Sequence, residues 1–427
     1  MTVFAELDRA ELAAMKDSLL DRYRAFQDRN LTLDMTRGKP SSEQLDLSMP
    51  MMAEDVSRQY MTEQGIDCRN YGGLDGISDA KSLFAAYLEV AEDEIIVGDS
   101  ASLKMMHDTI MGGLVYGMVD SEIPWGKLPA VKFLCPSPGY DRHFAVCQYL
   151  GIEMIPVAMD ANGPDMDTVE ELAANDESIK GIWCVPKYSN PTGITYSDAV
   201  VDRLASMQAK ARDFTIMCDN AYTVHHLTDS PDYLKNFLSA CKSAGNPERV
   251  FIYGSTSKVT FAGGGVAMMA GSRRNIEFML SKMQFQTIGP NKLNQLRHVL
   301  FFNNMAGINV HMKKHAAILK PKFDAVLAVL DKELGGKDIA SWSKPKGGYF
   351  ISIDMMQDCA RAVVEMASQA GVKLTPAGAT YPYGKDPEDR NIRIAPSFPV
   401  AEDVSTAMEL VAICIQLVSV EKLLNNG

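Results

Sequence analysis

The sequence lacks the features that mark membrane, secreted and metal-binding proteins. None of its apolar stretches is long enough to span a bilayer. Residues 1–8 have neither a basic flank nor an apolar core, so we expect no signal peptide. The eight cysteines form no C-x-x-C pair and no His/Cys cluster, which argues against a zinc site and a disulfide framework. We therefore expect reduced thiols, a cytoplasmic location, no membrane partner and no metal.

An excess of positive charge is also lacking. The chain has 42 Lys and Arg residues against 54 Asp and Glu residues, which gives a formal net charge of −12. This balance disfavours binding to nucleic acid or to anionic membranes. It does not restrict small-molecule substrates, because one basic pocket can lie inside an acidic protein.

The pattern that is present indicates an α/β protein. At 427 residues, 46% of them hydrophobic, the chain is long enough for two domains. Near-continuous apolar strands are expected at 131–135, 153–157, 181–185, 215–219 and 250–253, between amphipathic helices that include 77–88 and 196–212. This alternation predicts a parallel sheet with helices on both faces.

The ends of the chain differ from its middle. Long helices are expected at about 305–335 and 400–422, around short strands at 348–353 and 391–394, which predicts a smaller α+β domain. Residues 1 to about 30 have the pattern of an amphipathic helix, which we expect to pack on the body or on a partner subunit. The predicted division is 1–60 for the N-terminal helix and part of the small domain, 61–304 for the large domain, and 305–427 for the rest of the small domain.

A single lysine follows the apolar run at 250–253. Lys258 ends the hydroxyl-rich turn Ser255-Thr256-Ser257-Lys258, where the backbone leaves the predicted sheet. Desolvation lowers the pKa of an amine at such a place, and the free amine can attack a carbonyl. A surface lysine after a strand fits the same four residues, so other positions have to decide between the two interpretations.

Further polar residues lie where other predicted strands end. Asn190 and Asp219 follow apolar strands, and parallel sheets bind ligands at this edge. Ser100, Ala101 and Ser102 begin a predicted helix, whose free N–H groups attract an anion; simple capping by Ser100 or Ser102 is the alternative.

These positions together match the needs of a pyridine-ring cofactor that carries an aldehyde and a phosphate. The aldehyde needs an amine, the ring nitrogen a carboxylate, the ring hydroxyl hydrogen-bond donors, the phosphate a helix N-terminus with hydroxyl groups, and the ring face an aromatic. In that order the chain offers Lys258; Asp219; Tyr222 and Asn190; Ser100, Ala101, Ser102 and Ser255; and Tyr140.

Three motifs resemble those of the fold-type-I aminotransferases that depend on pyridoxal phosphate, in the aspartate aminotransferase superfamily. They are Ser-Asn-Pro-Thr-Gly at 189–193, Asp-Asn-Ala-Tyr at 219–222 and Ser-Thr-Ser-Lys at 255–258, and the resemblance extends from Tyr71 to Arg393. The segment 36–40 and the triple glycine 263–265 are similar to a divergent bacterial subgroup of aspartate aminotransferases. The resemblance implies a large domain on a mainly parallel seven-stranded sheet, with a smaller α+β domain.

The resemblance also implies roles around the cofactor. Lys258 binds the cofactor aldehyde and moves the proton at the substrate Cα, while Asp219 keeps the ring nitrogen protonated. Tyr222 and Asn190 hydrogen-bond the ring oxygen, and Tyr140 stacks on the ring.

The remaining implied roles concern the substrate and a second subunit. Arg393 binds the substrate α-carboxylate, because a guanidinium matches a carboxylate bidentately, and Asn190 and Gly38 also lie at the substrate. Tyr71 reaches the phosphate of the neighbouring subunit, which implies a homodimer with shared active sites.

Two positions depart from the family pattern. Val266 stands where many relatives have a phosphate-binding arginine. Dicarboxylate-specific relatives often have an arginine just before the segment that matches 289–292, and they supply it to the site of the partner subunit. Residues 285–288 stand at that place here and contain no cation. Arg37, Lys39 and Arg142 are the candidates to bind a side-chain carboxylate instead.

We expect a ping-pong transamination of L-aspartate with 2-oxoglutarate, which yields oxaloacetate and L-glutamate. An alanine–glyoxylate or broad-specificity aminotransferase is the main alternative. A lyase on the same scaffold, or a regulator that only senses the cofactor, is less favoured. Such regulators carry a basic winged-helix domain ahead of the aminotransferase-like part, and we expect the first segment here, of about 30 residues, to be too short to form one.

Overall fold

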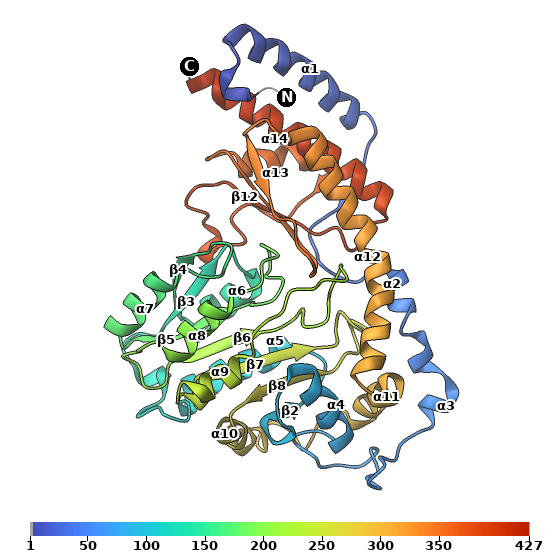
Figure 1. The fold of residues 1–427 in the computed structure, drawn as a ribbon, viewed down its shortest axis with the longest axis vertical. Helices are drawn as coiled ribbons and strands as arrows, with labels where there is room; N and C mark the ends of the chain where they lie inside the picture. Colours follow the sequence, from blue (N-terminus) through green and yellow to red (C-terminus); the bar gives the residue numbers. More distant parts are fainter. Residues whose placement is uncertain (1–2, 427) are drawn as a thin grey trace.

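The computed structural model describes residues 3–426, which form a large body and a smaller one (Figure 1). Met1, Thr2 and Gly427, which fall in the predicted end segments, lie outside the described residues. The large body is built on one wide sheet, and the smaller body combines short sheets with long helices. The helix α12 (Met305–Leu334) runs along both bodies (Figure 1).

The wide sheet has seven strands in the described residues, in the order β2-β8-β7-β6-β5-β3-β4. Their bounds are β2 Ile95–Val97, β3 Lys132–Ser137, β4 Glu153–Ala158, β5 Ile179–Cys184, β6 Thr215–Asp219, β7 Val250–Ser255 and β8 Ala267–Gly271. β8 runs antiparallel to both neighbours, and the strands from β7 to β4 are parallel. The predicted mainly parallel, seven-stranded sheet is confirmed.

The sheet explains why its strands are apolar runs instead of alternating patterns. β5, β6 and β7 are buried along their whole length. Ile216 and Ile252 join the core on one face, while Met217 and Phe251 join the core on the other. Successive side chains of a strand point to opposite faces, so a sheet that is covered twice needs apolar residues at every position.

Helices cover both faces of this sheet, as the sequence predicts. Those of the large body are α4 Ser78–Leu88, α5 Ser102–Tyr116, α6 Asp141–Tyr149, α7 Met166–Asn175, α8 Asp198–Ser206, α9 Phe237–Ser243, α10 Arg273–Met283 and α11 Lys292–Phe302. Short 3₁₀ turns are η1 Phe4–Glu6, η2 Met49–Met52, η3 Glu92–Glu94, η4 Trp125–Lys127, η5 Pro247–Arg249 and η6 Pro382–Gly384.

The helix expected at 196–212 is wrong in its extent. α8 spans Asp198–Ser206, and Met207 already has extended backbone angles. Arg249 stops the helix, because its Nη1 donates hydrogen bonds to the carbonyl oxygens of Ala205 at 3.0 Å and Met207 at 2.7 Å. A cation that satisfies the free carbonyls of a helix end stabilises that end. Arg249 is distant in sequence, so the local pattern gave no sign of it.

The smaller body holds the predicted α+β unit. Its three-stranded antiparallel sheet has the order β12-β10-β9, and β1 pairs in parallel with β11. The bounds are β1 Leu33–Asp34, β9 Ala340–Trp342, β10 Ile351–Met355, β11 Val372–Lys373, β12 Asn391–Ile394, α1 Arg9–Gln27, α13 Ala360–Gln369 and α14 Ala401–Asn426. Two short helices, α2 Ser42–Asp46 and α3 Glu54–Ser57, follow the chain along the large body, where α2 packs on α12 and α3 on α11 (Figure 1).

The N-terminal helix belongs to this smaller body. α1 packs against α14, which itself packs against α12. Asp8 caps α1 by accepting hydrogen bonds from the backbone N–H groups of Ala10 and Glu11, both at 2.8 Å. The strand expected at 348–353 begins later, at Ile351, because Gly348 has a φ of +81° and packs closely on Tyr188. The proposed domain boundary after residue 304 coincides with the start of α12 and remains a prediction.

Candidate active site

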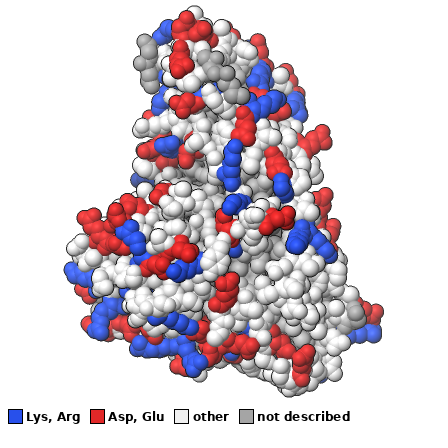
Figure 2. All heavy atoms as spheres, viewed as in Figure 1, with Lys and Arg blue, Asp and Glu red and all other residues white. Residues whose placement is uncertain are grey.

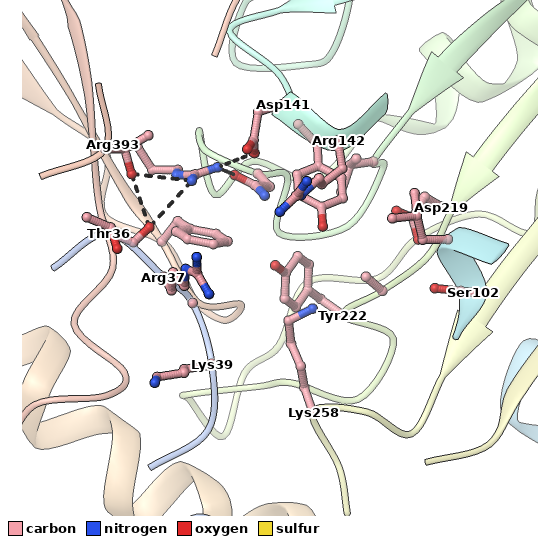
Figure 3. Close-up of a pocket in the computed structure, with 18 of the residues that line it drawn as sticks. Thr36, Arg37, Lys39, Ser102, Asp141, Arg142, Asp219, Tyr222, Lys258 and Arg393 are labelled. Atoms are coloured by element: carbon pink, nitrogen blue, oxygen red, sulfur yellow. Dashed lines mark hydrogen bonds and ion pairs between the residues drawn. The ribbon is translucent and has the colours of Figure 1, made fainter. Parts of the chain in front are cut away.

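A cavity of about 630 Å³ lies between the carboxyl ends of the parallel strands and the smaller body (Figure 3). The large body lines it with residues that follow β3, β5, β6 and β7. The smaller body contributes Asp34, residues 36–39, Phe350, residues 373–376 and Arg393. Lys258, Asp219, Tyr222, Tyr140, Asn190, Ser102, Gly38 and Arg393 of the predicted set all line this cavity.

Lys258 reaches the cavity from the turn after β7. Its Nζ lies 5.1 Å from the centre of the Tyr222 ring. Burial lowers the pKa of the Lys258 amine, and the negative charge of Asp219 opposes part of that effect. A lowered pKa increases the share of free amine, which is the form that attacks carbonyls and accepts protons.

Asp219 is the last residue of β6 and is buried. Its Oδ2 lies 2.9 Å from His143 Nε2, while its Oδ1 is buried without a hydrogen-bond partner among the described residues. The His143 ring is stacked on Trp183, with ring centres 4.1 Å apart. Sequence reasoning missed His143; its spacing of three residues from Tyr140, at the start of α6, is the signal that points to it.

The two tyrosines keep their hydroxyl protons at neutral pH. Burial, together with the charge of Asp219, raises the pKa of Tyr140 to about 12. Burial also raises the pKa of Tyr222 well above its ordinary value. Both phenols are therefore hydrogen-bond donors toward the cavity.

Arg393 projects from β12 and is held by several neighbours. Its Nη1 donates to Asp141 Oδ1 at 3.0 Å and to Asn190 Oδ1 at 3.2 Å, and its Nη2 donates to Thr375 Oγ1 at 3.3 Å. The guanidinium also lies over the Phe350 ring, 4.8 Å from its centre. Asp141, Thr375 and Phe350 were not among the predicted residues.

Gly38 lines the cavity beside Phe350. A Cβ atom at Gly38 would lie 2.4 Å from the Phe350 ring, closer than any side chain tolerates. The segment 36–40 can therefore approach the ring closely only with glycine at this position.

The N-terminus of α5 lies at the other end of the cavity. α5 begins at Ser102, and its N-cap residue is Ala101, which has no side-chain oxygen to cap the helix. Neither Ser100 nor Ser102 is the N-cap residue, so the alternative of simple capping by a serine is not found. Ser257 Oγ lies 2.7 Å from Ser255 Oγ and donates to the Ser100 carbonyl at 3.1 Å. Ser100 itself lines an adjacent cavity of about 520 Å³, together with Arg297.

The position of the missing arginine is occupied by a buried side chain. Val266 is buried directly before β8 and packs in the core of the large body. Its backbone N–H donates to Thr256 Oγ1 at 2.8 Å, and its carbonyl accepts from Thr256 N–H at 2.8 Å. Val266 thus holds the lysine-bearing turn and presents no charge.

Tyr71 does not line the cavity of its own chain. The side chain is 83% exposed, on a loop that Lys292 holds from below. Lys292 Nζ donates to the carbonyl oxygens of Asn70 and Gly72, both at 2.6 Å. The loop is therefore fixed in place while Tyr71 points away from the body.

The cavity is basic although the chain as a whole is acidic. Among the described residues, its lining includes six basic side chains and three carboxylates: Arg37, Lys39, Arg142, Lys258, Lys373 and Arg393 against Asp34, Asp141 and Asp219. Within residues 3–426, neither Arg37 nor Arg142 has a carboxylate within 4.0 Å (Figure 3 places them on opposite sides of the space between Arg393 and Lys258). Lys373 was not predicted.

These residues fit pyridoxal phosphate. The unpartnered Asp219 Oδ1 is a buried acceptor of the kind that a protonated ring nitrogen needs, since buried carboxylates are otherwise paired. Lys258 supplies the amine and the start of α5 the uncapped N–H groups for a phosphate. No group of three or more His, Cys, Asp or Glu side chains in the described chain could hold a metal ion. Fold and site together define the class: a fold-type-I aminotransferase that depends on pyridoxal phosphate.

Comparison with known proteins identifies the family. The aspartate amino-transferase family model matches residues 7–426. The chain is 46% identical to a putative aminotransferase of Mycolicibacterium smegmatis, over 99% of both chains. It is 43% identical to an aspartate aminotransferase of Corynebacterium glutamicum, over 98% of this chain and 97% of that protein. The chain belongs to the aspartate amino-transferase family.

A solved structure agrees with this assignment. The crystal structure of an aspartate transaminase from Corynebacterium glutamicum superposes with a TM-score of 0.96, at 42% identity and over 99% of both chains. Family membership implies pyridoxal phosphate as the cofactor and small molecules as substrates. Separately, none of the helices in residues 3–426 has the length and apolar character needed to cross a membrane.

Proposed function

We propose that the protein transfers the amino group of L-aspartate to 2-oxoglutarate, giving oxaloacetate and L-glutamate. The observation that carries this proposal is the surplus of cations around Arg393 in the cavity. One guanidinium is enough for an α-carboxylate. Arg37 and Arg142 provide charge for a second carboxylate, which aspartate, glutamate and both oxo acids carry and alanine does not.

The chain's own residues have defined tasks in this reaction. Arg393 binds the α-carboxylate and orients the substrate, because its donors are arranged by Asn190 and Thr375. Bound pyridoxal phosphate supplies an electron sink that makes the Cα–H bond of the amino acid acidic. The Lys258 amine then accepts the Cα proton, and its lowered pKa keeps it available as a base.

Two further groups act on the charge in the site. Asp219, fixed by His143 at 2.9 Å, provides the carboxylate for the cofactor's ring nitrogen. Tyr222 would donate a hydrogen bond to the cofactor's ring oxygen, because its raised pKa keeps the phenol protonated. The alternation of two half-reactions on one site makes the kinetics ping-pong.

We also propose a homodimer in which Tyr71 serves the neighbouring site. Tyr71 is exposed on a rigidly held loop, and Phe285 and Ile288 are exposed on the segment that leads to Gly289. Gly289 packs against Gly72, so the two segments are adjacent. Large exposed apolar side chains that gather in this way are typical of protein interfaces.

A substrate comparison tests the dicarboxylate assignment. The ratio of kcat/KM for L-aspartate to that for L-alanine is measured for the wild type and for Arg37→Met and Arg142→Met. We expect a wild-type preference for aspartate, and at least one variant that lowers kcat/KM for aspartate about 10²-fold while leaving alanine within about threefold, since a charge-assisted hydrogen bond contributes about 1.5–3 kcal/mol. Equal losses for both substrates, or a wild type that prefers alanine, would refute the assignment.

A further inference from the structure

Buried side chains from distant parts of the chain contact the backbone carbonyl groups of Lys258 and of the next residue, Val259. His311 Nε2 lies 2.7 Å from the Val259 oxygen. His225 Nε2 lies 3.3 Å from the Lys258 oxygen, and the Tyr349 hydroxyl donates to the same oxygen at 3.4 Å. All three side chains are buried. The two consecutive peptide groups that follow Lys258 and Val259 are thus each held at the carbonyl oxygen.

The neighbours of the histidine rings determine where their protons lie. Gln44 Oε1 accepts a hydrogen bond from the Ser41 N–H at 3.1 Å, so its Nε2 is the group that faces His315 Nδ1, at 3.0 Å. His315 Nδ1 is therefore an acceptor, and the proton is on Nε2. The Nε2 atoms of His315 and His311 are 3.1 Å apart, and His311 is the ring that contacts the Val259 carbonyl.

These rings stay neutral at neutral pH. Burial lowers the pKa of His315 to about 4 and also lowers the pKa of His311. Burial and the charge of Lys258 lower the pKa of His225 well below its ordinary value. A second proton, on His315 Nδ1, would face the amide N–H of Gln44, so this contact also favours the neutral ring.

The network connects the lysine turn to the smaller body. His311 and His315 lie on α12, which runs along both bodies (Figure 1). Gln44 lies on α2, and its Nε2 also donates to the Tyr349 hydroxyl at 3.0 Å. Tyr349 precedes β10, whose neighbour β12 carries Arg393.

We propose that His225, Tyr349 and the pair His311 and His315 are positioning residues, which hold the Lys258 backbone so that the Lys258 amine faces the substrate Cα. The lysine side chain is long and flexible, so the direction of its backbone limits where the amine can reach. Misplacement of a reacting group by about 1 Å can cost about 10²-fold in rate. The inference rests on the proposed role of Lys258 as the group that moves the Cα proton.

Two variants at one position separate this role from simple packing. His311→Gln keeps an N–H donor near the place of Nε2, whereas His311→Met fills a similar volume without a donor. In the cofactor-loaded enzyme we expect His311→Met to lower kcat about tenfold, with KM for aspartate changed by less than about twofold. The isotope effect with aspartate deuterated at Cα rises, and His311→Gln recovers most of kcat. Backbone amides of 256–261 exchange faster with deuterium in His311→Met only.

The outcomes decide the proposal in either direction. Equal kcat in the two variants, or a loss in His311→Met that is confined to KM, overturns it. If His311→Met does not fold, Tyr349→Phe removes one donor to the Lys258 oxygen without a cavity; a lower kcat with a larger isotope effect supports the proposal, and an unchanged kcat contradicts it. A wild type without activity on aspartate would instead refute the proposed function. The deuterium exchange of the 256–261 amides would still test whether His311 holds this segment of backbone.

Discussion

At the residue scale, the guanidinium of Arg393 already has a carboxylate partner within the chain. Asp141 Oδ1 accepts from Arg393 Nη1 at 3.0 Å, and Asp141 is only partly buried. Both Nη atoms of Arg393 donate to two oxygens each, the fourth being the Thr36 carbonyl at 3.5 Å, and only the buried Nε lacks a hydrogen-bond partner among the described residues. A substrate α-carboxylate must therefore share the guanidinium with Asp141.

Replacement of Asp141 by Asn tests this competition. Asn keeps the shape and an acceptor oxygen but removes the charge, so we expect KM for aspartate and for 2-oxoglutarate to fall about three- to tenfold, because charge-assisted hydrogen bonds contribute more than neutral ones. We expect kcat to stay within about twofold of the wild type. Steady-state kinetics measure both constants. A higher KM would mean that Asp141 orients Arg393 more than it competes with the substrate.

The same site shows what sequence can and cannot give at this scale. Lys258, Asp219 and Asn190 could be grouped because each follows an apolar strand, and parallel strands bring these ends to one edge. Asp141 and Thr375 could not be grouped with Arg393, because their contacts join segments that are far apart in the chain. The net negative charge of the chain likewise gave no indication that the side chains lining the cavity are mainly basic.

At the element scale, α12 carries two buried histidines in its first half, His311 and His315. Neutral buried histidines make the folded state sensitive to acid. The pKa of His315 is about 4 in the folded protein against an ordinary value of 6.5. Between these two values the unfolded chain binds a proton that the folded chain does not, so stability falls as the pH falls.

His315→Gln should reduce this acid sensitivity. Gln keeps a hydrogen-bonding amide but does not titrate, so the variant lacks one contribution to acid destabilisation. We expect the melting temperature, relative to the wild type, to improve by about 2 °C between pH 7.5 and pH 5, the shift that about 2 kcal/mol gives in a chain of 427 residues. Thermal unfolding at the two pH values measures the difference. A constant difference between wild type and variant would show that His315 does not titrate in this range.

The elements themselves were predictable to different degrees. The strands of the wide sheet appear in the sequence as apolar runs because both faces of the sheet are covered. The end of α8 could not be predicted from the local sequence, because Arg249, which is distant in the chain, stops the helix there. The start of β10 was also misjudged, since the positive φ of Gly348 delays the strand.

At the scale of the whole molecule, one region of the surface is poor in charge. Figure 2 shows few charged side chains over the part of the large body where α11 lies. The side chains of Met49, Met52, Leu293 and Leu300, on η2 and α11, are exposed, and these two elements contact each other. The loop with Tyr71 is tied to α11 through Lys292. We take this region as the face that a second copy covers.

Phe285→Asp should weaken the proposed dimer. Phe285 is 83% exposed, and a charge placed there would be desolvated at an interface. We expect the wild type to have about twice the 46.9 kDa of one chain, and the variant to shift toward 46.9 kDa at micromolar concentration. Sedimentation velocity measures both masses. Tyr149→Asp, at an equally exposed aromatic residue at the end of α6, is the control and should remain a dimer. A wild-type mass of one chain would contradict the dimer.

The role of Lys258 is tested by following the cofactor absorbance of the loaded enzyme when L-aspartate is added without an oxo acid. We expect the band of the lysine-bound cofactor to be lost in a single half-reaction and to return when 2-oxoglutarate is added. Lys258→Ala, which removes the amine, should show neither change. A loaded wild-type enzyme whose band is unaffected by aspartate, or a Lys258→Ala variant that converts aspartate at the wild-type rate, would show that Lys258 does not carry out transamination of aspartate in this cavity.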